Sequence, residues 1–273
     1  MASGRWVSAL ALVALNFGAG HKTPAAQNLA GIAHVAFRVT DVEKSKQFYS
    51  SLGFEEAFEF ADPGKPRVSY IKINDQQFIE LYGRAGDSQP IGLMHVCFEA
   101  ADIEALRKEY ARRGVIAPES KKARAGNLLF SIHDPNGQSV EFTQYLPGSL
   151  HSEDRGKHLG ERRISEHLVW VIVPVQDLSA TRNFYTNKLG FGDASIDTAI
   201  RLRLPGRSRE ALGLDGASAA PKPRIGFAIS DLERAKKDLW SRGFEVRSTR
   251  VSAAVLDPDG TVVEFTPDRL GAR

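Results

Sequence analysis

The chain has 273 residues, of which 42% are hydrophobic and 25% are charged, a balance typical of soluble globular proteins. A formal net charge of +3, with the basic residues scattered, gives no basis for nucleic-acid binding, and the length accommodates one large or two ordinary domains. The single cysteine, Cys97, excludes an intrachain disulfide and a cysteine-based zinc cluster. Its apolar surroundings (LMHVCF) predict a small buried hydrophobic residue rather than a nucleophile.

Residues 1–27 have the build of a signal peptide. MASGR supplies a positive start, WVSALALVAL an apolar stretch of ten residues, and a tail of small residues follows. The apolar stretch is too short to span a bilayer, and no later segment is long and apolar enough to do so. We therefore expect an exported protein, periplasmic or secreted. A flexible N-terminus with a chance apolar patch is the alternative.

The segments 32–53 and 93–114 align without gaps at an offset of 61 residues. Each begins with an apolar, partly β-branched run that predicts a strand. An aspartate then stands at the position of a helix N-cap, apolar residues follow at helical spacing, and a glycine closes the helix. The matched pairs are His34 and His95, Val35 and Val96, Phe37 and Phe98, Asp41 and Asp102, Tyr49 and Tyr110, and Gly53 and Gly114.

Three more strand-like runs follow each predicted helix. They are EEAFEF, RVSYIKI and QFIELYG in the first unit, and IAPESKK, LLFSIH and SVEFTQY in the second. The pattern predicts two βαβββ units, a tandem repeat that forms one domain over residues 28–147. Residues 164–273 repeat these elements more loosely, and the polar segment 148–163 is predicted to be a linker. The fold class is therefore α+β, with two tandem domains.

A glutamate in the middle of a predicted strand, such as Glu80 in FIELYG, is ordinarily just solvated. Here the offset of 61 residues carries Glu80 onto Glu141, and 46 residues separate His34 from Glu80 as they separate His95 from Glu141. Strand alternation allows all four side chains to share one face. Two imidazoles and two carboxylates suit one divalent metal ion (Zn, Ni, Mn, Co or Fe) and leave up to two octahedral positions for water or substrate. The alternative is four unrelated solvated or hydrogen-bonded side chains.

The paired units, the D-(V/L)-x-x-(S/A)-x-x-F-Y-x(3–4)-L-G-F helix and the DP(N/D)G-x-x-x-E-F ending resemble the vicinal oxygen chelate superfamily. That group includes glyoxalase I, methylmalonyl-CoA epimerase, extradiol dioxygenases, and fosfomycin and bleomycin resistance proteins. The resemblance implies an open eight-stranded cup for each domain, with metal ligands on its first, fourth, fifth and eighth strands. Those positions are His34, Glu80, His95 and Glu141.

A filled set of four ligands is similar to bacterial glyoxalase I, and Arg38 stands where that enzyme has an arginine that binds glutathione. Arg84 and Ile91 depart from the glyoxalase pattern, which argues against glutathione as the substrate carrier. Extradiol dioxygenases use only two histidines and one glutamate. Their proton-handling tyrosine is replaced here by Ser131, and residues 121–124 lack their histidine. The dioxygenase reading therefore comes second.

The second domain lacks the ligand set. By register from its two helix-capping aspartates, Trp170 and Arg224 occupy the histidine positions, and only Glu264 of the four ligands is retained. His167 lies three residues early, which places it on the opposite strand face. We expect this half to pack against the first and to shape or close its cup.

These residues predict a metal-dependent glyoxalase-like enzyme, a lyase or isomerase that acts on a small molecule with vicinal oxygens. The metal would stabilise the negative charge that develops when an α-proton leaves, with Glu141 as base and Glu80 as its partner. Arg38, Lys121 and Arg124 are candidate substrate-binding residues, although the last two also fit a solvated loop. A metal-free binding protein of the resistance type is the rival from another class. No nucleic-acid or membrane partner is expected, and the chain is a monomeric pseudo-dimer or a homodimer.

Overall fold

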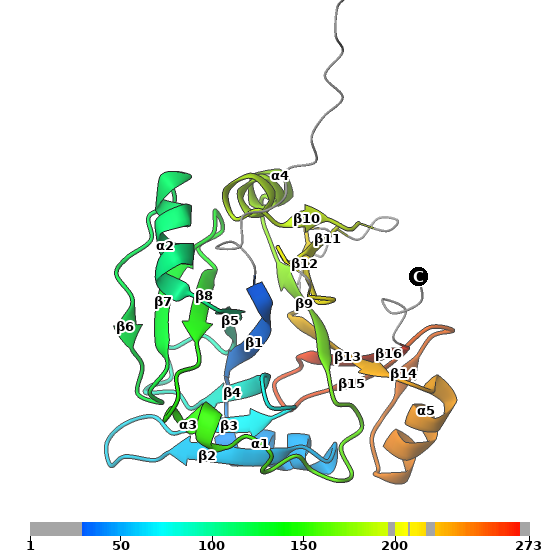
Figure 1. The fold of residues 1–273 in the computed structure, drawn as a ribbon. Coiled ribbons are helices and arrows are strands. Elements are labelled where there is room, and N and C mark those ends of the chain that lie inside the picture. The colour runs from blue at the N-terminus through cyan, green and yellow to red at the C-terminus, as the bar shows by residue number, and fades with distance from the viewer. Residues whose placement is uncertain (1–28, 196–199, 207, 217–221, 268–273) are drawn as a thin grey trace, which may run out of the picture.

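The computed structural model describes residues 29–195, 200–206, 208–216 and 222–267, and contains two eight-stranded sheets with a helix-bearing side each (Figure 1). The strand order is β2-β3-β4-β1-β5-β8-β7-β6 in the first sheet and β10-β11-β12-β9-β13-β16-β15-β14 in the second. The two orders are the same when each sheet is counted from its own first strand. The prediction of two tandem α+β domains, each an open cup of paired modules, is confirmed.

The first sheet is built around two long central strands, and each outer module extends away from them. β1 runs parallel to β4 and antiparallel to β5, which in turn runs parallel to β8. Its strands are β1 (Leu29–Arg38), β2 (Glu55–Phe60), β3 (Val68–Lys72), β4 (Phe78–Tyr82), β5 (Gly92–Ala100), β6 (Lys121–Lys122), β7 (Leu128–His133) and β8 (Ser139–Gln144). The first strand of each module thus meets the last strand of that module at the centre of the sheet.

The second sheet repeats this pairing. β9 runs parallel to β12 and antiparallel to β13, which runs parallel to β16. Its strands are β9 (Leu168–Pro174), β10 (Gly192–Asp193), β11 (Ile200–Arg203), β12 (Ala211–Asp215), β13 (Arg224–Ile229), β14 (Arg247–Ser248), β15 (Ala253–Leu256) and β16 (Val262–Pro267). The edge strands β10 and β14, like β6, have only two residues each.

The helices begin where the capping aspartates predict. Each N-cap carboxylate accepts a hydrogen bond from the backbone N–H three residues later, which satisfies one of the unpaired donors of the first turn. The capped helices are α1 (Val42–Ser51, N-cap Asp41), α2 (Ile103–Arg112, Asp102), α4 (Leu178–Asn183, Asp177) and α5 (Leu232–Ser241, Asp231). A π-helical turn, η2 (Phe184–Lys188), continues α4. Gly53 and Gly114 follow the first two helices with φ of 88° and 75°, a conformation that favours glycine.

The hydrophobic core lies on the helix-bearing side of the sheets and is continuous between the two domains. Tyr49 and Tyr110, the matched helical tyrosines, are both fully buried. The rings of Phe54 and Phe227 lie 5.2 Å apart between centroids, and those of Phe48 and Phe244 lie 5.6 Å apart. Because the apolar side chains of both sheets face this shared core, the opposite, concave faces are left for polar groups.

The segment 148–163, predicted to be a linker, forms a short helix, α3 (Leu150–Glu153), and is anchored to the first domain. The backbone N–H of Leu150 donates to the carbonyl of Ala125, 2.8 Å away. The fully buried ammonium of Lys72, on the concave side of β3, lies 2.7 Å from the Asp154 carboxylate. This segment therefore contacts both modules of the first domain.

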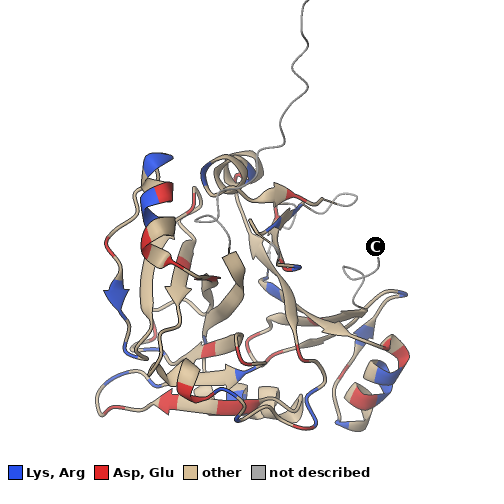
Figure 2. Ribbon diagram, in the orientation of Figure 1, with Lys and Arg blue, Asp and Glu red and all other residues tan. Residues whose placement is uncertain are grey.

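Basic and acidic side chains alternate along α2 and α5, so each of these exposed helices presents both charges (Figure 2). The predicted signal peptide, residues 1–27, lies outside the described residues. Within the described ranges, no helix has the length and apolar character needed to cross a membrane.

Candidate metal centre

Strand register brings the two predicted histidines and two predicted glutamates together on the concave face of the first sheet. Ala36 of β1 pairs with Glu80 of β4 on one side and with His95 of β5 on the other. Cys97 of β5 pairs with His34 of β1 and with Glu141 of β8. The four ligand candidates thus come from the four central strands, as their sequence spacing predicts.

The ring nitrogen His34 Nε2 lies at the middle of this group. It is 3.0 Å from His95 Nε2, 3.3 Å from Glu141 Oε1 and 3.4 Å from Glu80 Oε1. Glu80 Oε2 in turn lies 3.9 Å from His95 Nε2. His34, Glu80 and Glu141 are buried, and His95 is partly exposed, so the group can be reached from the side of His95.

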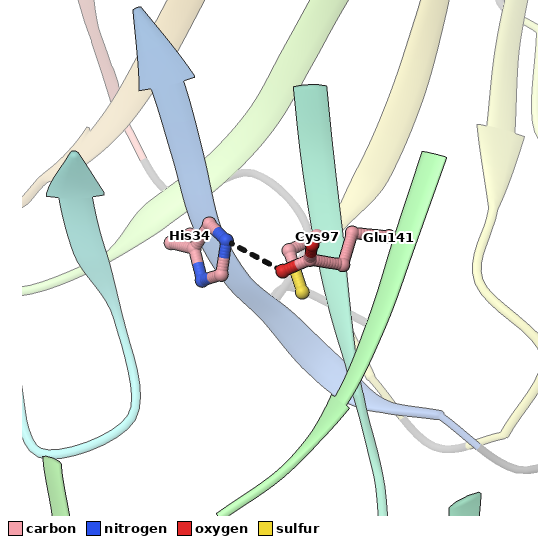
Figure 3. A group of neighbouring side chains, drawn as sticks. All are labelled: His34, Cys97 and Glu141. Atoms are coloured by element: carbon pink, nitrogen blue, oxygen red, sulfur yellow. Dashed lines mark ion pairs between the residues drawn. The ribbon is translucent and has the colours of Figure 1, made fainter. Parts of the chain in front are cut away.

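Two hydroxyl groups and a thiol hold the carboxylates. Tyr82 Oη donates a 2.9 Å hydrogen bond to Glu80 Oε2, and Ser131 Oγ lies 3.3 Å from Glu141 Oε2. Figure 3 shows His34, Cys97 and Glu141 on neighbouring strands, with a dashed line for the His34–Glu141 ion pair. Cys97 is fully buried, as predicted, but its sulfur faces the polar group and not the hydrophobic core.

The ionisation of the group reflects burial set against closely spaced opposite charges. Burial disfavours a charge on His34, but the carboxylates of Glu80 and Glu141 outweigh it and raise the pKa of His34. Burial raises the pKa of Glu80 and lowers that of His95 to about 4. Burial also opposes the charge on Glu141, yet the hydrogen bond from His34 and the charges of the two histidines bring its pKa down to about 2. Without a metal, the opposite charges therefore favour a proton on His34 beside an ionised Glu141.

The donor set fits a divalent transition metal. Ligand nitrogens and oxygens lie about 2.0–2.2 Å from such an ion, so neighbouring ligand atoms are about 3 Å apart. The 3.0–3.4 Å separations around His34 Nε2 have this scale, and two imidazole Nε2 atoms at 3.0 Å face each other with room for only one proton between them. His34, Glu80 and His95 form one possible ligand group, and His34, Cys97 and Glu141 form another.

The predicted substrate-binding residues lie at separate places around the cup. Arg38 Nη1 donates to the carbonyl of Pro90 at 3.1 Å. Arg124 forms a 2.7 Å ion pair with Asp62 and lies 3.9 Å above the ring of Phe60. Phe60 ends β2, the edge strand at the other side of the sheet from β6, and Asp62 follows it. This contact joins the loop between β6 and β7 to the end of β2, so the two edges of the curved sheet approach each other.

Lys121 lies on the exposed edge strand β6, away from these contacts. Neither it nor Arg124 is placed beside the four ligand candidates by a hydrogen bond or an ion pair among the described residues.

Several residues of the centre carry no signal in the sequence repeat. Tyr82 and Ser131 occupy strand positions whose partners in the other module differ, and only the strand alternation from Glu80 and Glu141 would place them on the concave face. His151 of α3 was missed because the segment around it shows little periodicity, and Tyr145 was missed because it ends the last predicted strand without a chemical signal of its own. Their rings stack at a centroid distance of 4.5 Å beside the centre.

The comparisons with known proteins agree with this geometry. Residues 31–142 match the sequence model of the Glyoxalase/Bleomycin resistance protein/Dioxygenase superfamily. The first domain belongs to this superfamily. No curated protein matches the chain significantly.

Solved structures share the fold over most of the chain. The Mn(II)-bound glyoxalase from Novosphingobium aromaticivorans is 17% identical with a TM-score of 0.67, over 88% of this chain and 83% of that one. A catechol 2,3-dioxygenase is 14% identical with a TM-score of 0.67, over 88% of each chain. An extradiol ring-cleaving dioxygenase from B. fuscum is 19% identical with a TM-score of 0.66, over 90% of this chain and 74% of that one. At these identities the similarity establishes the fold alone, over both domains.

The second cup has different residues at the positions that correspond to the four candidate ligands. Trp170 pairs with Gly226, and Ile172 pairs with Arg224 and with Gly213. The positions of His34, Glu80, His95 and Glu141 are thus occupied by Trp170, Gly213, Arg224 and Glu264. The absence of a second ligand set at these positions agrees with the sequence prediction.

The second cup is instead filled by its own side chains. Arg224 Nη2 forms a 2.8 Å ion pair with Glu264 Oε2. A Cβ atom on Gly226 would lie 1.9 Å from the indole of Trp170, so glycine is required for the indole to rest there. His167, which precedes β9, lies 2.8 Å from the buried carboxylate of Glu210. It therefore belongs to the interface between the domains, since Glu210 also accepts from Gln77 of the first domain at 2.9 Å.

Proposed function

We propose that the first domain is a metal-dependent enzyme of glyoxalase type, a lyase or isomerase that moves a proton between neighbouring carbons of a small molecule with vicinal oxygens. The observation that carries the proposal is the convergence of His34, Glu80, His95 and Glu141 from the four central strands. A solvated or purely structural group has no reason to repeat in both modules at the same strand positions. A divalent ion held by these residues would draw electron density from two neighbouring substrate oxygens.

The two glutamates differ in how firmly they are held. Tyr82 anchors Glu80 through a 2.9 Å hydrogen bond, whereas Ser131 contacts Glu141 at 3.3 Å. The Glu141 side chain is also the more exposed of the two, 12% against 5%. We therefore assign proton acceptance to Glu141 and a fixed ligand role to Glu80.

In the proposed step, a C–H bond next to a substrate carbonyl breaks and its proton passes to a Glu141 carboxylate oxygen. The electron pair of that bond is delocalised onto the carbonyl oxygen, Glu141 returns the proton to the former carbonyl carbon, and the hydroxyl proton of the first carbon passes to the oxygen of the second. Atoms and electrons balance without an oxidant, so the step is an isomerisation. A general base of this kind contributes roughly 10²–10⁴-fold to the rate.

The test begins with the metal content of the purified protein and of the variants Glu80→Ala and Glu141→Gln. We expect about one divalent ion per chain in the wild type, loss or weakening of that ion in Glu80→Ala, and retention in Glu141→Gln. Hydroxy-ketones and thiohemiacetals are then incubated in D₂O, and loss of the α-proton signal is followed by NMR. Wild type should exchange the proton and Glu141→Gln should not.

Two results would contradict the proposal. A protein without metal after reconstitution would be a binding protein of the resistance type. Oxygen-dependent ring cleavage of a catechol, with no α-proton exchange, would instead support the dioxygenase reading.

A further inference from the structure

His151, in the segment between the two domains, is buried at 2% exposure, and the proposed function does not use it. Neither of its ring nitrogens has a hydrogen-bond partner within the described part of the chain. An unpaired buried polar group costs about 1–3 kcal/mol, so the position is unfavourable for the protein alone. Such a cost suggests that the imidazole finds its partner in something that binds there.

The surroundings of His151 are four aromatic rings. Tyr145 stacks on it at 4.5 Å with an interplanar angle of 23°, and three further rings meet it edge to face. Those three are Phe78 at 4.9 Å, Phe58 at 5.1 Å and Tyr70 at 5.6 Å, measured between centroids. Rings offer a flat apolar wall but no strong partner for a ring nitrogen.

The same rings place His151 beside the metal centre. Phe78 pairs with His34 across β1 and β4 and precedes Glu80 by two residues, so it lies on the same strand face. Burial lowers the pKa of His151 to about 3, an effect that the charge of His34 reinforces and that of Glu141 opposes. The imidazole is therefore neutral near pH 7, with one nitrogen that donates and one that accepts.

The protein holds this imidazole in place from both sides. The Ser149 hydroxyl caps α3, and the Leu150 N–H donates to Ala125 of the second module. On the other side Lys72 donates to both the carboxylate and the backbone carbonyl of Asp154. An anchored helix that presents an unpaired imidazole to an aromatic wall is the arrangement expected of a ligand contact.

We propose that His151 is a ligand-contacting residue of the first cup, where its imidazole hydrogen-bonds the organic molecule that the metal centre holds. This inference rests on the proposed function. It also narrows the substrate class, because a charged group would be poorly solvated among these rings. The part of the substrate that faces α3 is flat and uncharged, and it carries a hydrogen-bond donor or acceptor.

The test measures binding of benzohydroxamic acid to the Zn²⁺-loaded protein by calorimetry. This probe has two neighbouring oxygens for the metal and a flat ring for the wall. His151→Phe keeps a ring of similar size and removes both nitrogens, whereas His151→Gln keeps a donor and an acceptor. We expect His151→Phe to weaken the probe about tenfold, the worth of one hydrogen bond, and His151→Gln to recover part of the loss. His133→Phe, at an exposed histidine of β7, is the matched control and should bind as the wild type does.

Stability separates this role from a structural one. A ligand contact predicts that metal-free His151→Phe melts at a higher temperature than the wild type, because the unpaired nitrogens are gone. A structural role predicts a lower melting temperature and an unchanged affinity for the probe. ¹⁵N-histidine NMR of the wild type gives a second test, which does not depend on whether His151→Phe folds. On probe binding a ring nitrogen of His151, identified by its absence in His151→Gln, should shift by several ppm.

The two failures are distinguishable. A wild-type protein that binds neither Zn²⁺ nor the probe overturns the proposed function and this inference with it. A wild type that binds both, with His151→Phe within twofold of its affinity and no shift at His151, overturns the inference alone.

Discussion

The two cups of this molecule share a strand order and a register, yet their concave faces carry different side chains. In the first, His34, Glu80 and His95 converge with Glu141 around one point. In the second, the corresponding space holds the Trp170 indole and an ion pair between Arg224 and Glu264. The first interior holds the four candidate metal ligands, whereas in the second Arg224 neutralises Glu264 and the Trp170 indole occupies space.

The difference shows that the fold and the centre are specified by opposite faces of the same strands. Val35 and Phe37 of β1 face the shared core, as do Val171 and Val173 of β9, and all four are buried. The alternate positions, His34 in one strand and Trp170 in the other, are free to change because the core does not depend on them. The second domain can therefore lack the four candidate ligands and still have the same fold as the first.

The largest expected effect comes from giving the first cup one residue of the second. His95→Arg places a cation where the second cup has Arg224, beside a glutamate that can pair with it. We expect Zn²⁺ affinity to fall roughly a thousandfold or more, since a ligand is replaced by a positive charge. Calorimetric titration measures the loss, and circular dichroism should show an unchanged fold.

The reverse change, Arg224→His, serves as the control and should leave the stoichiometry at one metal ion per chain. Unweakened Zn²⁺ binding by His95→Arg would break the comparison, because the metal would then lie elsewhere.

Building the first centre into the second cup sharpens the comparison. Glu264 is already present, and four changes supply the rest: Trp170→His, Ile172→Ala, Gly213→Glu and Arg224→His. The alanine is needed because a Cβ atom on Gly213 would lie 2.6 Å from Ile172 Cγ1, and the first cup has Ala36 at that position. We expect the Zn²⁺ content, measured by mass spectrometry of the metal, to rise from one to two ions per chain.

The variant with the other three substitutions but without Gly213→Glu is the matched control, and it should bind the second ion more weakly or not at all. If the variant with all four substitutions folds but binds no second ion, the positions in the second cup are not equivalent to those in the first.

The cups also differ in what covers one end of the concave face. Lys72 of β3 is buried against Asp154 of the interdomain segment, whereas its counterpart Arg203 of β11 is exposed. Lys72→Met removes the buried ammonium from the Asp154 carboxylate, which then keeps only His158 as a side-chain partner, and should lower the free energy of unfolding by about 3 kcal/mol. Arg203→Met should change it by less than about 0.5 kcal/mol. Urea denaturation measures the free energy of unfolding of both variants. Equal effects would contradict the claim that the interdomain segment covers the first cup at Lys72 while the second cup is open at Arg203.

A smaller effect depends on pH. The pKa of His151 is about 3 in the folded protein against 6.5 for a free imidazole, so the folded state disfavours its proton. The stability that depends on neutral His151 is present above pH 6.5 and is lost as the pH falls toward 3. His151→Phe lacks this loss, so its stability advantage over the wild type should grow by about 2 kcal/mol between pH 7.5 and pH 5. Urea denaturation of the metal-free proteins at both pH values tests this, and a constant difference would contradict it.

The convergence of the four candidate ligands could be predicted from the sequence because both strand periodicity and the repeat constrain their positions. His34 and His95, like Glu80 and Glu141, fall at matching places in units whose boundaries the capping aspartates and closing glycines mark. Strand alternation then places them on one face without any knowledge of tertiary contacts. The same register places Trp170 at the position of the second domain that corresponds to His34.

The sequence could not predict contacts that bring distant segments together. The segment 148–163 is polar and aperiodic, yet His151 lies among rings from three strands because Lys72 and Asp154 meet across 82 residues. Likewise, the Arg124–Asp62 ion pair depends on how far the sheet curves. Cys97 was placed correctly as buried, and strand alternation from His95 puts it on the concave face, but only its pairing shows that it lies beside His34 and Glu141.

The most direct test of two unlike cups is anomalous X-ray diffraction at the zinc edge, from crystals of the Zn²⁺-loaded protein. The account predicts one anomalous peak per chain, about 2.0–2.2 Å from the Nε2 atoms of His34 and His95 and from oxygens of the two glutamates. It predicts no peak between Trp170 and Glu264. A peak in the second cup, or a fully loaded protein with no peak in the first, would contradict it.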